Sequence, residues 1–451
     1  MATRRRLMRE FVHDCLYARS GYFSSPSERV YHPPAPVRFG ALIGEADWRR
    51  TQAELVSRAS AGFLTPVEYF QPWYARALGR YVVGEHLREA ARAGLEGAPA
   101  HPLRIVEMGG GNGTCAAGLL GWLRDEYPSL YDSCSYELVE ISPAMAERQS
   151  HRLREAGIDT DRYVVHNTSA IDWARRGARE RAPCAPAGGD GGAGDAAPAA
   201  TPCFILGLEL LDNLPHDLVR WTARGLEQAV VVPRAAAGEA SGGNDASWDA
   251  FEQQWEPLAD ARLRWIADLL KLDSRAAWRA AALSRARAHP GLDVLRPARA
   301  GAAWLSAVGA TRPSLWVPTS AALLIDGLIR SEPAHRLVLA DFDWLTPQPG
   351  GALLAPVVQS RAGASTLDRG GRVLEASDGE CDVFYPTDFP MLARLYEALG
   401  GARARVVKSR AFMREHAELE CAETRSGYNP LVEDFSNTAL LLGEARAAPC
   451  A

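Results

Sequence analysis

A chain of 451 residues with 47% hydrophobic and 23% charged residues has the composition of a folded protein with a large core, which argues against disorder. The formal net charge of −5 gives no general attraction for nucleic acid, so we expect no nucleic-acid partner. No run approaches the roughly 18 consecutive apolar residues that a helical membrane span needs, so we expect no span. The eight cysteines contain no C-x-x-C pair, so we expect free thiols and no metal site.

The N-terminal residues 1–17 carry four arginines before the first acidic residue, Glu10. A basic start without acids is compatible with a mitochondrial transit peptide, although this one is short. It is equally compatible with an amphipathic first helix that turns Leu7, Phe11 and Leu16 inward. Both interpretations stay open at this point.

The sequence pattern divides the chain into several regions. Residues 1–95 are rich in aromatic side chains and end in a predicted helix, and we expect them to form an N-terminal cap or lid. Strands alternate with helices over residues 96–235 and 311–451, which we expect to form the core. A Gly/Ala/Pro-rich loop at about 180–202 interrupts it. Residues 236–310 contain "WDAFEQQWEPLADARLRWIADLLKL", which predicts an inserted helical subdomain.

The core region follows a regular order of short apolar runs and helical patterns. "LRIVEMG", "YELVEIS", "RYVVHNT", "CFILGLELL" and "RLVLADFDWL" are typical of buried strands, and "ALLLG" near the C-terminus predicts the last one. The helix after "YELVEIS" starts at Pro143, a residue suited to a first helical turn. Strands that alternate with helices predict an α/β fold with a doubly wound, mostly parallel sheet.

The stretch "RIVEMGGGNGT" is an apolar strand that breaks into a glycine-rich turn, with Glu107 directly before the turn. Gly109, Gly111 and Gly113 allow a tight turn and a close approach of a ligand to the backbone. Because "GNGTCA" satisfies the dinucleotide fingerprint G-x-G-x-x-A, an NAD-linked oxidoreductase is a competing interpretation. Glu107 argues against it, since a carboxylate here would repel a pyrophosphate and attract a cation.

S-adenosylmethionine carries an ammonium group and a sulfonium and no phosphate, so it is the cofactor we predict. Its amine would face Glu107, and its ribose diol needs an acceptor at the end of the next strand, where Glu140 stands. Asp172, after the third strand, is a candidate partner for the adenine amino group. An ordinary carboxylate at a helix start explains Asp172 equally well.

Three segments of this core, "VEMGGGNGT", "YELVEISPAMAERQ" and "LGLELLDNLPHDLV", resemble the MidA-like family of S-adenosylmethionine-dependent protein arginine methyltransferases. The resemblance extends to "SGYFSS" and "FLTPVEYFQPWY" near the N-terminus, whereas the two insertions do not match. It implies a seven-stranded, Rossmann-like methyltransferase sheet and symmetric dimethylation of a protein arginine. Mitochondrial members of the family are assembly factors of respiratory complex I, so the resemblance also implies a complex I subunit as partner and the matrix as location.

The resemblance also implies catalytic residues. Glu209, Asp212 and Pro215 match the family's E-x-x-D-x-L-P segment, and Glu209 with Asp212 would clamp a guanidinium. Acids at a helix start are the alternative for this pair. His216 is a candidate proton acceptor, although a surface or capping histidine is the better-supported interpretation. In the N-terminal segment, Thr65 starts a helix as its N-cap.

Thr65 and Glu68 would then reach the cofactor as part of a lid, while the neighbouring aromatic side chains are typical of core.

Two positions depart from the family's pattern. Leu208 stands where the family usually has Asn or His. Asp341 begins the segment "DFD", which lacks the glycine of the family's D-Y-G. We therefore predict an active protein arginine methyltransferase, with a noncatalytic assembly factor of the same fold as the alternative.

Overall fold

A computed structural model describes residues 5–24, 30–59, 62–92, 102–180, 202–234, 250–272, 314–346, 354–362 and 365–445. The loop expected at about 180–202 and most of the region expected to be a helical insertion lie outside these ranges. The helices are α1 (Met8–Tyr17), α2 (Glu45–Arg58), α3 (Pro66–Tyr69), α4 (Trp73–Arg92), α5 (Thr114–Glu126), α6 (Pro128–Ser133), α7 (Pro143–Glu155), α8 (Ala170–Glu180), α9 (Ala261–Leu269), α12 (Thr319–Ser331), α13 (Phe389–Leu399), α14 (Ser409–His416) and α15 (Pro430–Glu433).

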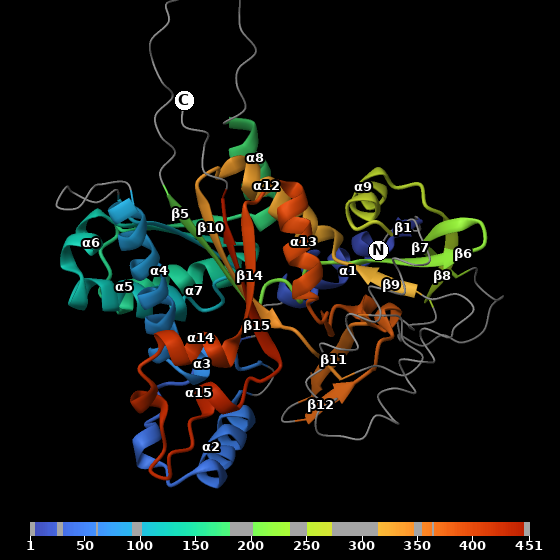
Figure 1. Ribbon diagram of the computed structural model, residues 1–451. Coiled ribbons are helices and arrows are strands. Elements are labelled where there is room, and N and C mark those ends of the chain that lie inside the picture. Colours follow the sequence, from blue (N-terminus) through green and yellow to red (C-terminus); the bar gives the residue numbers. More distant parts are fainter. Residues whose placement is uncertain are drawn as a thin grey trace, which may run out of the picture.

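The larger sheet contains seven strands in the described residues, in the order β14-β15-β10-β5-β2-β3-β4 (Figure 1). The strands are β2 (Arg104–Met108), β3 (Ser135–Glu140), β4 (Tyr163–Asn167), β5 (Cys203–Leu208), β10 (His335–Phe342), β14 (Arg403–Lys408) and β15 (Thr438–Glu444). Pairs from β10 to β4 are parallel, and β15 is antiparallel to β10 and β14. The α/β class is confirmed, and the sheet is mixed. The carboxyl ends of β2, β3, β5 and β10 therefore meet at one edge.

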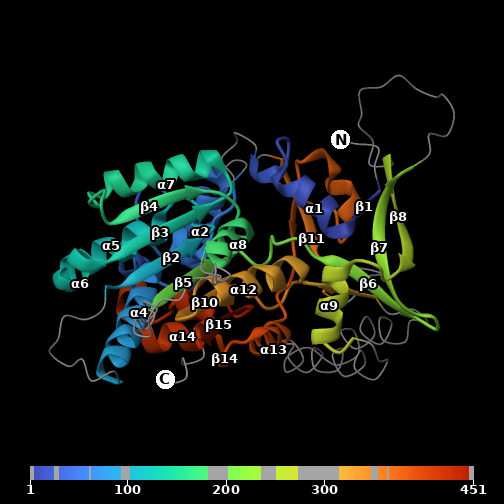
Figure 2. The ribbon, with the colours of Figure 1, turned by 90° about the horizontal axis from the view of Figure 1, so that it is seen from above.

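Both faces of this sheet are covered by helices (Figure 2). Side chains alternate along each strand, so Ile105 and Val106 of β2 enter different cores. One core joins the sheet to α4, α5 and α14, and the other joins it to α8, α12 and α13. Because both faces of these strands are buried, consecutive residues must be apolar, which explains the continuous apolar runs in the sequence.

A second sheet lies beside the first and receives the N-terminus of the described chain (Figure 2). Its strands are β1 (Arg6–Leu7), β6 (Asp217–Thr222), β7 (Gly225–Pro233), β8 (Phe251–Pro257) and β9 (Ser314–Val317). Strand β1 pairs with β7, so Arg6 and Leu7 belong to this sheet, whereas the segment at Thr65 does not. Residues 217–233, expected in the core region, belong to this sheet as well.

Strand β8 corrects the prediction of a helix over this stretch. Phe251 and Trp255 are four residues apart, a spacing that places side chains on one face of a helix and also of a strand. In the structure β8 pairs with β7 over residues 251–257, and both aromatic side chains pack against the core of the second sheet. The helix α9 begins only after Asp260, whose side chain caps it by accepting a hydrogen bond from the Leu263 N–H at 2.8 Å.

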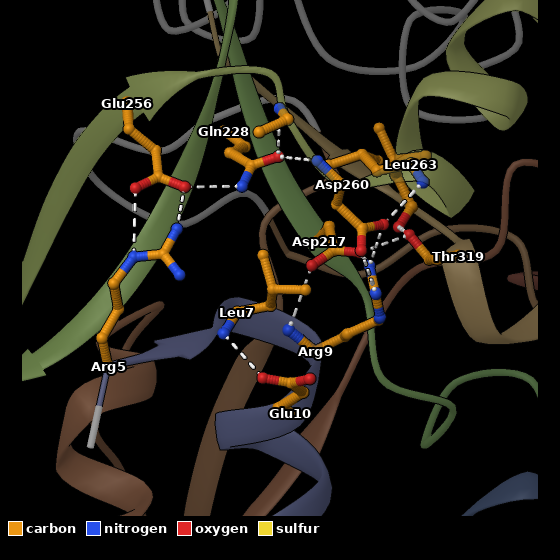
Figure 3. A network of polar contacts seen from close by, with 12 residues as sticks. Arg5, Leu7, Arg9, Glu10, Asp217, Gln228, Glu256, Asp260, Leu263 and Thr319 are labelled. Carbon is orange, nitrogen blue, oxygen red and sulfur yellow. Dashed lines mark hydrogen bonds and ion pairs between the residues drawn. The ribbon is translucent and has the colours of Figure 1, made fainter. Parts of the chain in front are cut away.

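The basic N-terminal segment is part of this fold. Helix α1 buries Phe11 and Leu16 completely, as the amphipathic-helix interpretation predicts. Arg9 is 8% exposed and its guanidinium lies between two carboxylates (Figure 3). It donates to Asp217 at 2.6 Å and to Asp260 at 2.8 Å, which joins α1 to β6 and α9.

A third sheet of the described residues contains β12 (Ser365–Asp368), β11 (Val357–Ala362) and β13 (Asp382–Phe384), and its β13 packs with α1 in one core. This arrangement brings residues near position 382 to the N-terminal helix. No helix in the described ranges has the length and apolar character needed to cross a membrane.

Candidate functional site

The glycine turn connects β2 to α5, where the sequence predicts it. Gly109, Gly111 and Gly113 have φ angles of +69°, +52° and +79°, which residues other than glycine rarely adopt. A Cβ atom at Gly113 would lie 3.0 Å from the Cα atom of Gln149. The turn therefore packs directly against α7 and leaves its backbone open to a ligand.

Glu107 lies under this turn, because a Cβ atom on Gly110 would come within 3.2 Å of the Glu107 carboxyl carbon. The side chain is buried, and its Oε2 accepts a hydrogen bond from the Tyr136 hydroxyl at 2.8 Å. Burial raises the pKa of Glu107 to about 7, against the lowering effect of the hydrogen bond from Tyr136. A cation brought to the turn would favour the ionised carboxylate.

Glu140 ends β3 beside the same turn. Its carboxylate accepts hydrogen bonds from the Ser142 N–H at 2.8 Å and from the Gln149 amide at 3.1 Å. The Gln149 amide also donates to the Gly111 carbonyl at 3.0 Å, so one side chain joins the acid to the turn. Burial raises the pKa of Glu140 to about 7.

Gln149 is a site residue that the sequence interpretation missed. It is fully buried, and its Oε1 has no hydrogen-bond partner among the described residues. It lies on the buried face of α7 with Met145 and Leu153, so a polar residue on an apolar stripe was the available signal. An acceptor oxygen beside Glu140 fits a ligand that brings hydroxyl or ammonium donors.

The N-terminal segment contacts the turn through Glu68. One carboxylate oxygen accepts from the Asn112 amide at 3.1 Å and from the Thr114 hydroxyl at 2.8 Å. The other is hydrogen-bonded to His32 Nδ1 at 2.6 Å. Thr65 caps α3 by accepting from the Glu68 N–H at 3.4 Å, so it starts the helix that presents Glu68, and a contact of Thr65 with the cofactor stays a prediction. His32 and Asn112 carried no signal in the sequence.

Asp172 stands in the first turn of α8 and its side chain is 65% exposed. It accepts a hydrogen bond from the Ser169 hydroxyl at 2.8 Å, and its N–H donates to that hydroxyl at 3.1 Å. These bonds are those of a helix-start carboxylate. A contact with adenine stays a prediction.

Three carboxylates, those of Glu209, Asp212 and Asp341, gather at the carboxyl ends of β5 and β10, and the Asp382 carboxylate of β13 interacts with Asp212. Asp341 accepts hydrogen bonds from the backbone N–H groups of Leu211 at 2.8 Å and Asp212 at 3.0 Å, so it shapes the turn that carries the predicted catalytic acids. Asp212 is 5% exposed, and its Oδ1 has no hydrogen-bond partner among the described residues. Glu209 has a φ angle of +49°, which is uncommon for a residue with a side chain.

The electrostatics of this cluster favour a positively charged ligand. Burial raises the pKa of Asp212 well above its usual value, and Asp341, Asp382 and Glu209 raise it further. Burial followed by Asp341 does the same for Glu209, and burial raises the pKa of Asp341 to about 7. Among the described residues, no ion pair joins Glu209, Asp212 or Asp341 to a basic side chain.

His216 is buried and packs against an aromatic side chain, so it is not a surface residue. Its ring stacks on Tyr385 with a centroid distance of 3.9 Å, and its Nδ1 is hydrogen-bonded to the Leu214 carbonyl at 2.7 Å. Burial lowers the pKa of His216 to about 4, so the ring is neutral at physiological pH. In the described residues no hydrogen bond joins His216 to Glu209 or Asp212. The ring is packed in the core, and its role as a proton acceptor stays a prediction.

The comparison with known families decides the chemical class. A sequence model of the family described as "Putative S-adenosyl-L-methionine-dependent methyltransferase" matches residues 82–407, which is more than two thirds of the chain. The chain belongs to this family. This methyltransferase therefore uses S-adenosylmethionine, which excludes the NAD-linked alternative. A search of curated proteins found no significant match.

Solved structures support the same fold. The methyltransferase resembles a COG1565 superfamily protein of Burkholderia thailandensis crystallised with S-adenosylhomocysteine, with 15% identity and a TM-score of 0.54. A second crystal structure of a COG1565 superfamily protein from that organism gives 15% identity and a TM-score of 0.51. Each match covers 98% of this chain and 89% of the other chain. At this identity the likeness shows the fold alone.

The residues of the methyltransferase fit its cofactor. Buried Glu107 and Glu140 offer carboxylates to an ammonium group and a diol, and the unpartnered Gln149 oxygen lies beside Glu140. The open backbone at the glycine turn would receive the part of the cofactor that lies between its ammonium group and its ribose. Among the described residues, no group of three or more His, Cys, Asp or Glu side chains is placed to hold a metal ion.

Proposed function

We propose that the protein transfers a methyl group from S-adenosylmethionine to the guanidinium of a protein arginine. The observation that carries the proposal is Asp212, a buried carboxylate with an unpartnered oxygen, beside the acids Glu209 and Asp341. Leaving a buried acceptor without a donor costs free energy. A planar cation with several N–H donors matches such a group of carboxylates better than a single-point ammonium does.

The residues would act by binding, orientation and proton acceptance. The cofactor supplies an electrophilic methyl group carried on a sulfonium. Glu209 and Asp212 would hold the guanidinium and localise its positive charge away from the attacking nitrogen. When the nitrogen bonds to the methyl carbon, the bond from that carbon to the sulfonium sulfur would break and leave a neutral thioether. The nitrogen would then lose a proton, and a carboxylate with a raised pKa is suited to accept that proton. Glu107 and Glu140 would fix the two polar ends of the cofactor.

Methylation of matched peptides tests the proposal. Purified protein with tritiated S-adenosylmethionine is offered extracts and synthetic peptides that contain arginine or, as controls, lysine. We expect label in methylarginine after acid hydrolysis, and a loss of at least about 100-fold in Asp212→Asn with cofactor binding retained. Label in methyllysine, or equal activity in the variant, would contradict the arginine assignment.

The finer proposal concerns the acceptor protein and the place of action. We propose symmetric dimethylation of a complex I subunit in the mitochondrial matrix, and this rests on the resemblance to the MidA-like family. Protease protection of the tagged protein in isolated mitochondria tests the location. Amino-acid analysis of complex I subunits from a deletion strain, which should lack the symmetric mark, tests the acceptor.

A noncatalytic assembly factor is the second candidate. Leu208 favours it, because this buried apolar residue precedes Glu209 where the related family usually has a polar one. Complementation of a deletion strain separates the two functions. Rescue by wild type and by Asp212→Asn alike would support a binding role, whereas rescue by wild type alone supports catalysis.

A further inference from the structure

The turn that carries Asp212 is tied to two distant elements through the next residue, Asn213. The Asn213 amide donates to Asp382 at 2.8 Å and to the Val383 carbonyl at 3.1 Å, both on β13. The Asn213 carbonyl accepts a hydrogen bond from the Tyr17 hydroxyl at 3.0 Å, at the end of α1. One residue therefore fixes a carboxylate and a phenol beside the acceptor acids.

Tyr17 lies where the acceptor acids and the ribose-binding end of the site meet. Burial raises the pKa of Tyr17, and the carboxylates of Asp212, Asp382 and Glu140 raise it further. Its ring stacks on Phe23 with a centroid distance of 5.6 Å and an interplanar angle of 17°, so the ring orientation is fixed. An aromatic ring among carboxylates offers a face to a planar cation.

Asp382 is 9% exposed and lies on β13 of the third sheet, whereas Asp212 lies in the turn after β5. The two carboxylates interact, since Asp382 raises the pKa of Asp212. A cation brought to this pair would favour the ionised form of Asp212. Asp212 still has an oxygen without a partner among the described residues, so the cluster has unused hydrogen-bonding capacity.

We infer that Asp382 is a further acceptor-binding carboxylate of the methyltransferase, and that Tyr17, held by Asn213, is a positioning residue that orients the acceptor cation. The inference rests on the proposed function, because the cation is the arginine guanidinium. It assigns acceptor recognition to three elements, namely α1, the turn after β5, and β13. The N-terminal helix α1 then contributes to the acceptor end of the site.

The test compares three variants with wild type, using an arginine peptide that wild type methylates. Asp382→Asn removes the charge and keeps the shape, and Tyr17→Phe removes only the hydroxyl. Asp388→Asn is the matched control, since Asp388 caps α13 by accepting from the Met391 N–H at 2.9 Å. Calorimetry with S-adenosylhomocysteine shows first that each variant is folded and binds cofactor product.

We expect Asp382→Asn to raise the peptide KM at least about tenfold with an unchanged Kd for S-adenosylhomocysteine. Tyr17→Phe should lower kcat several-fold with a smaller effect on KM, because it disturbs orientation and leaves the charges in place. Asp388→Asn should match wild type in both constants.

Equal kinetics for Asp382→Asn, Asp388→Asn and wild type would overturn this inference and leave arginine methylation standing. Wild type that binds S-adenosylhomocysteine but labels no arginine in any extract or peptide would overturn the proposed function and this inference together.

Discussion

The Glu68 carboxylate accepts a hydrogen bond from the Thr114 hydroxyl at 2.8 Å, across 46 residues of sequence. The same oxygen accepts from Asn112, so an acid of the N-terminal segment holds the turn expected to bind the cofactor. We therefore expect cofactor binding in this methyltransferase to depend on a segment outside the strand-turn-helix unit.

Replacing Glu68 by alanine should weaken S-adenosylhomocysteine binding about tenfold or more. The change leaves the Asn112 and Thr114 donors without their acceptor, and each such loss costs about 1–3 kcal/mol. Glu45→Ala is the control, because Glu45 is 59% exposed and pairs across the surface of α2 with Arg49. Calorimetry on both variants decides, and equal affinities would refute the role of Glu68.

Ionisation of Glu107 should make the stability of the apo protein depend on pH. Its pKa is raised to about 7 by burial, so the folded apo protein holds a proton that the unfolded chain releases at lower pH. The contribution of Glu107 to stability is therefore fully present below about pH 4.5 and is lost as the pH rises through about 7, by up to about 3 kcal/mol. Thermal melts of Glu107→Gln should show a shallower decrease between pH 5 and 8.

The affinity for the cofactor should have the opposite pH dependence, because the ammonium group of the cofactor favours the ionised form of Glu107. Affinity for S-adenosylmethionine in wild type should rise between pH 6 and 8, and it should stay nearly flat in Glu107→Gln. A wild-type affinity that falls over this range would show that the amine binds elsewhere.

Two glycines on either side of the start of α5 provide a matched pair. Gly113→Ala places a side chain at a φ of +79° with its Cβ atom 3.0 Å from the Gln149 backbone, so the variant should lose stability and cofactor affinity. A Cβ atom at Gly121 meets nothing within 4 Å, and Gly121→Ala should stabilise the helix by about 0.5–1 kcal/mol. Urea denaturation measures both, and an equal response would contradict the close packing at Gly113.

The buried ion pair of Arg9 should matter far more than the neighbouring surface pair (Figure 3). Arg9→Ala leaves Asp217, which is 1% exposed, without its cation, and we expect a loss of about 3–5 kcal/mol. Arg5 is 52% exposed and pairs with Glu256, so Arg5→Ala should cost about 1 kcal/mol or less. Comparable losses would mean that α1 is not anchored through Arg9.

Local pattern was sufficient for the elements whose residues interact with near neighbours in sequence. The apolar run ending at Met108, the glycine turn and α5 form one continuous unit, and Glu107 stands where its charge indicates. The stretch at Phe251 was wrongly predicted as helix, because a spacing of four satisfies both helical and strand periods. Only pairing with β7 chooses between them.

The sequence by itself determined the α/β class and the glycine turn with Glu107 and Glu140 beside it. These follow from periodicity, backbone freedom and charge, which act over a few residues. The acids at positions 209 and 212 were singled out only by the resemblance to a known family. Tertiary structure alone decided that Glu68 holds the turn, that His216 is packed in the core, and that Asn213 meets Asp382 across 169 residues. The reason is physical: a hydrogen bond between distant residues depends on how sheets and helices pack, and that packing is set by the whole core.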